Sequence, residues 1–266
     1  MLQKEWFATW FDSPYYHLLY QHRDHNEALL FLNHLIAQLA LASNAHVLDL
    51  ACGKGRHSIR LAQKGFSVVG ADLAANSIAA AEQNRVALGL DNLNFVVHDM
   101  RQPLDGQQFD AIFNLFTSFG YFDTLEENQA VCKSVADMLA PEGLLVIDFL
   151  NAHKVCKNLK PSEVISRDGA QFNIERWHDH KHIFKQIKVL DTLQNTVVGT
   201  FTERVQALSL AHFEDLLTPY FEIQATFGSY ALNSFNEQDS DRLIIIAKKK
   251  PIGNYSVFDG FVNDWF

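Results

Sequence analysis

The chain has 266 residues, of which 48% are hydrophobic, 20% charged and 12% aromatic, a composition that excludes disordered and collagen-like proteins. Its formal charge of −9 and pI of about 5.7 argue against nucleic acid as a partner, because a phosphate backbone attracts clustered excess lysine and arginine. The length allows either two small domains or one domain with an insertion.

The cysteines and the apolar runs indicate the compartment. Cys52, Cys132 and Cys156 have no C-x-x-C spacing and cannot all be paired, so neither a disulfide framework nor a thiolate zinc site is expected. The N-terminal residues lack the apolar core of a secretory signal, and no run of about 18 apolar residues occurs. We therefore expect a cytoplasmic protein that does not cross a membrane.

The first predicted element is an amphipathic helix over residues 24–42. Leucine and isoleucine side chains recur there at three- to four-residue spacing after Asp24, which is a typical helix-capping residue. This helix is predicted to pack on a core.

Apolar strand-like segments then alternate with helical ones up to residue 150. The strands read HVLDLA, FSVVGADL, LNFVVHD, FDAIFNLF and GLLVIDFL, and the helices include RHSIRLAQKG and NSIAAAEQNRVALG. Because buried parallel strands need helices on both faces, this alternation predicts right-handed βαβ units. The core is predicted to be a doubly wound α/β sheet over residues 46–155 and 207–250.

Residues 156–206 have a different pattern of polar and apolar residues. Polar and apolar residues alternate between turn formers, which predicts a small antiparallel β insertion with one wetted face. A helix with Ser209 as its N-cap follows, and the strands FEIQATFGSY and DRLIIIAKKK then return the chain to the main sheet. The tail, residues 251–266, is predicted to pack on its own domain or on a sister subunit through Phe258, Phe261, Val262 and Trp265.

The turn after the first strand has the features of a nucleotide site. The segment His46-Val-Leu-Asp-Leu-Ala-Cys-Gly-Lys-Gly-Arg-His57 joins a strand to a helix, and Gly53 and Gly55 let a ligand approach the backbone. A dinucleotide fingerprint needs a third glycine where this chain has Ser58, and the phosphate-loop motif is absent. A pyrophosphate is therefore not the expected ligand.

Acidic residues follow the next two strands. Asp72 comes 72 − 53 = 19 residues after Gly53 and can accept hydrogen bonds from two ribose hydroxyls. Asp99 can accept from an exocyclic amine, and Met100 can lie against a purine. These residues predict a site for adenosine.

The motifs resemble those of the class I S-adenosylmethionine-dependent methyltransferases in order and spacing. The likeness covers residues 45–151. The motif sequences are similar to those of the small-molecule subgroup that includes sugar-amine and glycine/sarcosine N-methyltransferases. It implies a mostly parallel, seven-stranded Rossmann-like sheet, S-adenosylmethionine as cofactor, and a small-molecule acceptor methylated on nitrogen or oxygen, with a homodimer as one option. The segments that carry it are VLDLACGKGRHSIRLA, VVGADLAANSIAAA, FVVHDMR, FDAIFNLFTSFGYF and LAPEGLLVIDFLN.

The resemblance also implies residue roles. It places Asp49 near the methionine amino group, and it places the backbone of Gly53 and Gly55 against the ligand. Asp72 is assigned to the ribose, and Asp99 with Met100 to the adenine. The other implied cofactor-binding residues are Tyr16, Arg23, Ala51, Leu73, Asn114, Leu115 and Phe116, the last three along the methionyl arm and the route to the acceptor.

Residues 1–45 are expected to form an N-terminal helical lid. The cluster Tyr15, Tyr16 and Tyr20, followed by Arg23, resembles the segment that in such enzymes folds over the cofactor. A pair between Arg23 and the methionine carboxylate is one interpretation, and ordinary helix packing is the other.

Catalysis by in-line displacement needs a lone pair about 3 Å from the methyl carbon and exclusion of water, so positioning supplies much of the rate. His153, Tyr121 and Tyr16 are the candidate catalytic residues, as base or hydrogen-bond acceptor, and His57 is a further option. Nothing in the sequence ranks them.

Other polar residues are expected to be structural. Lys54, Arg56 and His57 are typical of a solvated surface. No metal site is expected, because the alternating histidines of the insertion lack carboxylate partners at ligand spacing. These histidines are His178, His180 and His182.

Two alternatives to the methyltransferase remain open, a nicotinamide-dependent oxidoreductase and a non-catalytic scaffold that binds the cofactor or its product. The chain has Asn114-Leu-Phe-Thr117 where N-P-P-Y or D-P-P-Y marks methyltransferases of nucleic-acid or glutamine amino groups, which favours a small molecule. The insertion is expected to wall the acceptor pocket or to form a subunit contact.

Overall fold

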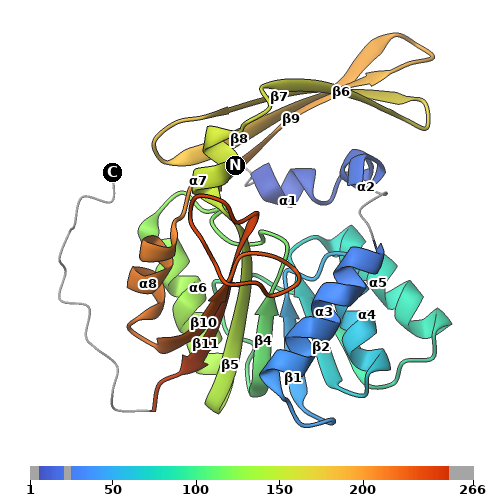
Figure 1. The fold of residues 1–266 in the computed structure, drawn as a ribbon. Helices are drawn as coiled ribbons and strands as arrows, with labels where there is room; N and C mark the ends of the chain where they lie inside the picture. The colour runs from blue at the N-terminus through green and yellow to red at the C-terminus, as the bar shows by residue number, and fades with distance from the viewer. Residues whose placement is uncertain (1–5, 21–24, 252–266) are drawn as a thin grey trace.

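The computed structural model describes residues 6–20 and 25–251, and it contains a seven-stranded and a four-stranded sheet (Figure 1). The large sheet has the order β10-β11-β5-β4-β1-β2-β3, and within it only β11 runs opposite to the other strands. The predicted Rossmann-like fold is thereby confirmed. Its strands are β1 (His46–Leu50), β2 (Ser67–Asp72), β3 (Leu93–Val97), β4 (Phe109–Asn114), β5 (Leu139–Leu150), β10 (Phe221–Phe227) and β11 (Arg242–Lys249).

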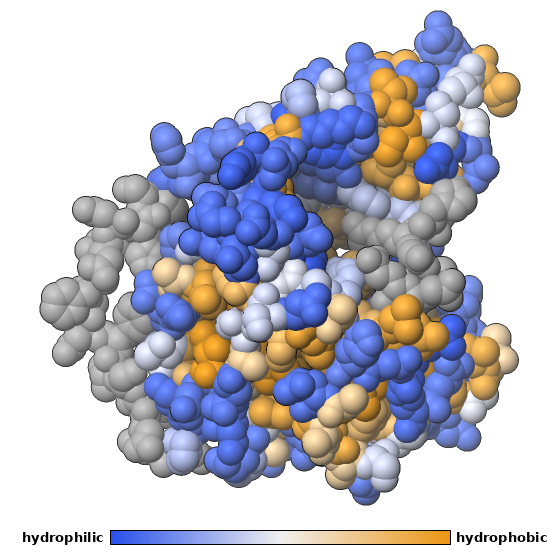
Figure 2. Space-filling model, in the orientation of Figure 1, coloured by the Kyte–Doolittle hydropathy of each residue, from blue (hydrophilic) through white to orange (hydrophobic). Residues whose placement is uncertain are grey.

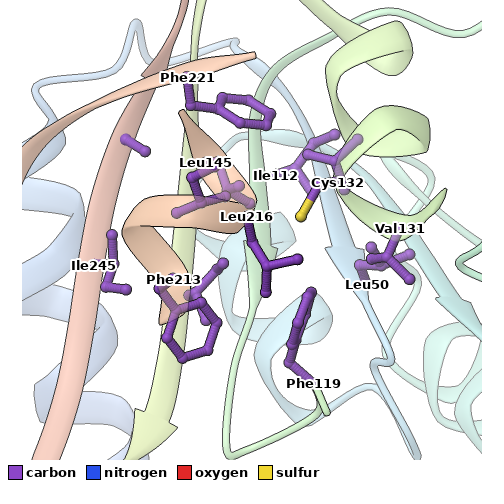
Figure 3. Packing of buried hydrophobic residues seen from close by; sticks show 14 of the residues in the cluster. Leu50, Ile112, Phe119, Val131, Cys132, Leu145, Phe213, Leu216, Phe221 and Ile245 are labelled. Atoms are coloured by element: carbon purple, nitrogen blue, oxygen red, sulfur yellow. The ribbon is translucent and has the colours of Figure 1, made fainter. Parts of the chain in front are cut away.

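Helices cover both faces of this sheet, as buried parallel strands require. Alternate residues of β1 point to opposite faces, so that Val47 packs with α3 and α4 while Leu48 packs with α6 and α8. Figure 3 shows the second cluster, in which Phe213 and Leu216 of α8 point toward the strands. The core helices are α3 (His25–Leu39), α4 (Arg56–Gln63), α5 (Ala75–Ala87), α6 (Leu125–Met138), α7 (Ala152–Lys157) and α8 (Leu210–Leu217).

Local sequence signals set the ends of several helices. The Ser209 side chain accepts from the backbone N–H of His212 in a capping box, as predicted for α8, and Thr124 and Glu127 form another at α6. The helix predicted over residues 24–42 corresponds to α3. The observed helix ends at Leu39, because Ala40 has a left-handed backbone with a φ of 49°.

The insertion forms a separate antiparallel sheet, which Figure 2 shows as a lobe above the core with a mostly hydrophilic visible face. Its strands are β6 (Ser162–Arg167), β7 (Ala170–His178), β8 (His182–Asp191) and β9 (Thr196–Gln206), so the first strand begins after α7.

The N-terminal helices α1 (Trp6–Trp10) and α2 (Pro14–Tyr20) lie between the two sheets (Figure 1). Trp10 of α1 and Leu19 of α2 pack on Phe172 and Ile187 of the small sheet. The two helices thereby cover the inner face of that sheet. The expectations for Arg23 and for the C-terminal aromatic residues fall outside the described residues. Of the helices in residues 6–20 and 25–251, none combines the length and apolarity needed to cross a membrane.

Candidate functional site

A cavity of about 840 Å³ lies where the large sheet, the helices α1 and α2 and the small sheet meet. Strand order reverses beside β1, which pairs with both β2 and β4, and such a reversal leaves a crevice at the carboxyl ends of parallel strands. The expected residues that line this cavity are Tyr16, Asp49, Ala51, Gly53, Asp72, Leu73, Asp99, Met100, Leu115, Phe116 and Tyr121.

The turn after β1 has a left-handed backbone. Ala51, Gly53 and Gly55 have φ values of 63°, 56° and 76°. A Cβ added to Gly53 meets no atom within 4 Å, so this backbone is open to a ligand, whereas one added to Gly55 comes within 2.3 Å of Phe95. Gly53 lines the cavity, and Gly55 serves the close packing of the turn on β3 instead.

Asp72 joins the tips of β1 and β2. Its Oδ2 accepts from the backbone N–H of Gly53 at 2.7 Å, and its Oδ1 accepts from that of Ala74 at 2.8 Å. Burial raises the pKa of Asp72, and these hydrogen bonds act against that rise. Each oxygen keeps a lone pair, so the fixed carboxylate can still accept from a ligand.

Asp49 is 1% exposed and borders the same cavity. Its Oδ2 accepts a hydrogen bond from Ser58 Oγ at 2.6 Å. Burial raises the pKa of Asp49 to about 6, and the nearby charge of Asp72 adds to the rise. A cation in the cavity favours the ionised form of this carboxylate.

Asp99 is held by a residue that the sequence did not single out. Arg101 Nε donates to both carboxylate oxygens at 3.1 Å, its Nη2 donates at 2.6 Å, and its Nη1 reaches Glu127 at 2.7 Å. Burial acts to raise the pKa of Asp99, but the hydrogen bonds and charge of Arg101 lower it overall. Asp99 is therefore an oriented, ionised side chain.

The loop after β4 brings a buried ion pair to the cavity. Phe116 and Thr117 have φ values of 60° and 62°. The backbone N–H of Phe116 donates to the carboxylate of Asp148 at 2.9 Å, and that of Thr117 donates to the backbone carbonyl of Asp148 at 2.8 Å. Arg242 Nε donates to Asp148 Oδ1 at 2.7 Å, and its Nη2 donates to Thr117 Oγ1 at 3.0 Å.

Asn114, which was expected along the methionyl arm, does not line the cavity. Its side-chain amide instead donates to the backbone carbonyls of Leu50 and Ser118.

The pKa of Arg242 reflects this pairing. Burial acts to lower it, but the charge of Asp148 raises it overall. No sequence motif connected these two residues, which are 94 positions apart.

His57 lies in the wall of the cavity, so its interpretation as a solvated surface residue was wrong. It is 6% exposed and its ring stacks on Phe116 at 5.1 Å between centroids. Burial lowers the pKa of His57 to about 3, and the charge of Arg56 adds to this effect. A neutral imidazole with so low a pKa is a weak base near neutral pH.

The catalytic candidates are placed differently. Tyr121 lies in the cavity against Trp6 and Phe11, with ring centroids 5.4 and 5.2 Å away, and its hydroxyl donates to the carbonyl of Thr117. Tyr16 also lines the cavity. His153 is exposed on α7 and is not part of the lining.

The helix α2 contributes a residue that sequence reasoning missed. His17 lines the cavity, and burial together with the charge of Lys54 lowers its pKa to about 4. Tyr20 lines the cavity as well, whereas Tyr15 packs under the small sheet. Only the tyrosine cluster marked this segment in the sequence.

Parts of this chain are similar in sequence to known proteins. YqeM of Bacillus subtilis, whose name places it among methyltransferases, is 35% identical over 133 residues, 49% of this chain and 53% of that protein. The glycine N-methyltransferase of Mus musculus is 35% identical over 118 residues, 40% of each chain. The chain thus spans about half the length of these relatives or less.

Solved structures share the fold. An S-adenosylmethionine-dependent methyltransferase from Clostridium acetobutylicum superposes with a TM-score of 0.75 at 18% identity, covering 88% of this chain and 95% of that one. The sugar N-methyltransferase KedS8 from Streptoalloteichus gives a TM-score of 0.69 at 18% identity, covering 89% and 93%.

A family model described as a methyltransferase domain matches residues 41–197, more than half of the chain. This range includes the tips of β1 to β5 and most of the small sheet. The chain belongs to the methyltransferase-domain family.

Proposed function

We propose that this protein transfers the methyl group of S-adenosylmethionine to nitrogen or oxygen of a small-molecule acceptor. The observation that carries the proposal is that Asp49, Asp72 and Asp99, from the tips of three neighbouring strands, border one cavity. Methyltransferase names among the relatives support it, and none of those reported supports an oxidoreductase.

The residues present fit an adenosyl sulfonium. The open backbone at Gly53 leaves room for a ligand. The carboxylates of Asp49, Asp72 and Asp99 border the cavity and suit a sulfonium and an ammonium better than a pyrophosphate. When bound, S-adenosylmethionine supplies an electrophilic methyl group. We assign Asp72 to the ribose hydroxyls, Asp99 and Met100 to the adenine, and Asp49 to the methionine ammonium.

The opposite wall positions the acceptor and excludes water. Trp6, Phe11 and Tyr16 contribute apolar surface there. The Tyr121 hydroxyl donates a hydrogen bond to the backbone carbonyl of Thr117, so its oxygen can accept a hydrogen bond from the N–H or O–H of the acceptor. We therefore propose Tyr121, with Tyr16 beside it, as the residues that orient the attacking atom.

The names of similar proteins support a small acceptor, and the cysteines support a reducing compartment. Glycine and sugars are the acceptors that the names of two similar proteins give. Cys52, Cys132 and Cys156 are free thiols, which is consistent with the cytoplasm. A homodimer stays a prediction.

Calorimetry with S-adenosylmethionine, S-adenosylhomocysteine and NAD tests the cofactor. We expect saturable binding of the first two and none of NAD, and the reverse pattern contradicts the proposal. Transfer of tritiated methyl from S-adenosylmethionine into a metabolite extract then tests turnover. Tight binding without any labelled product supports the non-catalytic scaffold instead.

A further inference from the structure

The small sheet presents an apolar pair to the cavity near Tyr121. Ile183 of β8 is paired directly with Val205 of β9, and both side chains line the cavity. The backbone N–H of Gln206 donates to the carbonyl of Gly120 at 2.8 Å. This bond joins the end of β9 next to Val205 to the loop that carries Tyr121. The position that we assign to the attacking atom therefore lies close to an apolar part of the small sheet.

Two other parts of the fold add apolar surface to the cavity. The ring centroids of Trp6 and Phe11 lie 5.4 and 5.2 Å from that of Tyr121. Val155 of α7 and Leu159, which follows this helix, line the cavity as well. Walls of this kind bind the apolar body of a ligand, because its surface is removed from water.

The charged side chains that the small sheet adds to the lining are paired within the protein. Arg176 contacts the carboxylate of Glu163. Lys185 donates to the Tyr20 hydroxyl, and its Nζ lies 3.8 Å from Glu203 Oε2. Tyr20 in turn donates to Glu203 Oε1 at 2.8 Å. An anionic ligand would have to break these partly buried pairs, which is costly.

The other lysine and arginine side chains of the lining are also committed. Arg242 is bound to Asp148. Lys54 and Arg56 flank Gly55 in the turn after β1, which we assign to the cofactor. Within residues 6–20 and 25–251, the lining therefore leaves no lysine or arginine near Tyr121 for a carboxylate or phosphate of the acceptor.

We propose that the methyl acceptor is an apolar primary or secondary amine that carries neither a carboxylate nor a phosphate. This inference rests on the proposed function, whose acceptor it defines. The names of two similar proteins give glycine and a sugar as acceptors. Glycine carries a carboxylate, and a sugar needs hydrogen-bond partners for its hydroxyls, so this apolar wall suits neither of them.

The same wall favours nitrogen as the attacking atom. Apolar surroundings disfavour an ammonium and favour the neutral amine, whose lone pair needs no base. Burial lowers the pKa of His17 to about 4 and that of His57 to about 3, so neither histidine would serve an alcohol as a base near neutral pH. The nitrogen forms a bond to the methyl carbon while the C–S bond breaks with its electron pair left on sulfur. The methylated ammonium then loses its proton to water after release.

Calorimetry on protein saturated with S-adenosylhomocysteine compares phenethylamine with phenylalanine, which differs from it only by a carboxylate. We expect saturable binding of the amine. Phenylalanine should bind more weakly by about tenfold or more, because its carboxylate loses water without gaining a partner, and glycine should bind no more tightly than phenylalanine. The inference is wrong if phenylalanine or glycine binds as tightly as phenethylamine, or if none of the three binds.

The variant I183A should weaken the binding of phenethylamine several-fold, because apolar contact is lost. The matched control is V164A, since Val164 is 64% exposed on β6 and does not line the cavity. S-adenosylhomocysteine affinity should be equal in the wild type and both variants. Equal amine affinity in I183A and V164A contradicts the apolar wall. Failure of the wild type to bind S-adenosylhomocysteine contradicts the proposed function instead, and the amine titration is then read on the protein alone.

The labelled products of the metabolite extract give a second measurement. We expect them to pass into an organic solvent at alkaline pH and to return to water at acidic pH, as apolar amines do. Labelled products that stay in water at every pH overturn the inference while they support the proposed methyl transfer.

Discussion

At the scale of residues, three aspartates at three strand tips have three different electrostatic environments. Burial raises the pKa of Asp49 to about 6, whereas Asp72 is clamped by two backbone N–H groups. Asp99 is paired with Arg101, which lowers its pKa although burial opposes this. The same residue type thus supplies a titrating group, a fixed acceptor and a permanent negative charge to one cavity.

Asp72→Ala should weaken S-adenosylhomocysteine binding by about 2 kcal/mol, because charged hydrogen bonds to the ribose are lost. Calorimetry measures the change, with Asp105→Ala as the control, since Asp105 is exposed and outside the cavity. Unchanged affinity in a folded Asp72→Ala variant contradicts the ribose assignment.

Asp49 should make stability depend on pH. Its folded pKa of about 6 lies above the ordinary value of 3.8, so in between the folded protein retains a proton that the unfolded chain has released. Its contribution to the free energy of unfolding is complete below about pH 4 and declines as the pH rises through about 6. Urea unfolding across this range should give a flatter profile for Asp49→Asn, but not for Asp105→Asn.

At the scale of elements, β5 and β11 fix a loop that β4 alone does not determine. Asp148 on β5 accepts from the backbone of Phe116 and from Arg242 on β11, and Arg242 also reaches Thr117. Two consecutive left-handed residues are costly, and this buried pair stabilises them. The cavity wall near the proposed transfer position therefore depends on two distant strands.

Asp148→Asn should lower the free energy of unfolding by about 3 kcal/mol, because a buried Arg242 is left without its counter-charge. The matched control is Asp241→Asn, which breaks the Lys154–Asp241 pair, where Asp241 is 78% exposed. We expect that change to cost under about 1 kcal/mol in the same denaturation experiment. Equal costs for the two variants mean that Asp148 does not stabilise the loop.

At the scale of the whole molecule, the helices α1 and α2 connect the small sheet to the core. Trp10 and Tyr20 donate to Glu203 of the small sheet, while Asp12 accepts from the backbone and side chain of Asn76 at 2.9 and 2.8 Å. The helices α1 and α2 are thus attached both to the small sheet and to α5, and side chains of both helices line the cavity.

Asp12→Ala should speed amide hydrogen exchange in residues 6–20 several-fold, because the attachment to α5 is lost, and leave β1 and β4 unchanged. Mass spectrometry of exchange measures this, with Asp91→Ala as the control on an exposed loop. Equal exchange in residues 6–20 of Asp12→Ala and the wild type contradicts a role for this attachment.

Local patterns were enough to predict the sheet, the insertion and the acids at the strand tips. Alternation, periodicity and the turn residues around Gly53 act over a few positions, so they are readable along the chain. The partners Arg101, Asp148 and Arg242 were not predicted, and neither was the burial of His57. Each depends on which side chains the fold brings to the same place.

The Rossmann-like sheet, the acidic strand tips and the resemblance to methyltransferases follow from the amino-acid order, because short-range spacing encodes strands, turns and motif order. The folded protein was needed to show that Tyr121 faces the cavity while His153 does not, and that Arg176, Lys185 and Glu203 of the small sheet line it. Burial and cross-strand register arise from packing between segments far apart in the chain, and no local spacing encodes them.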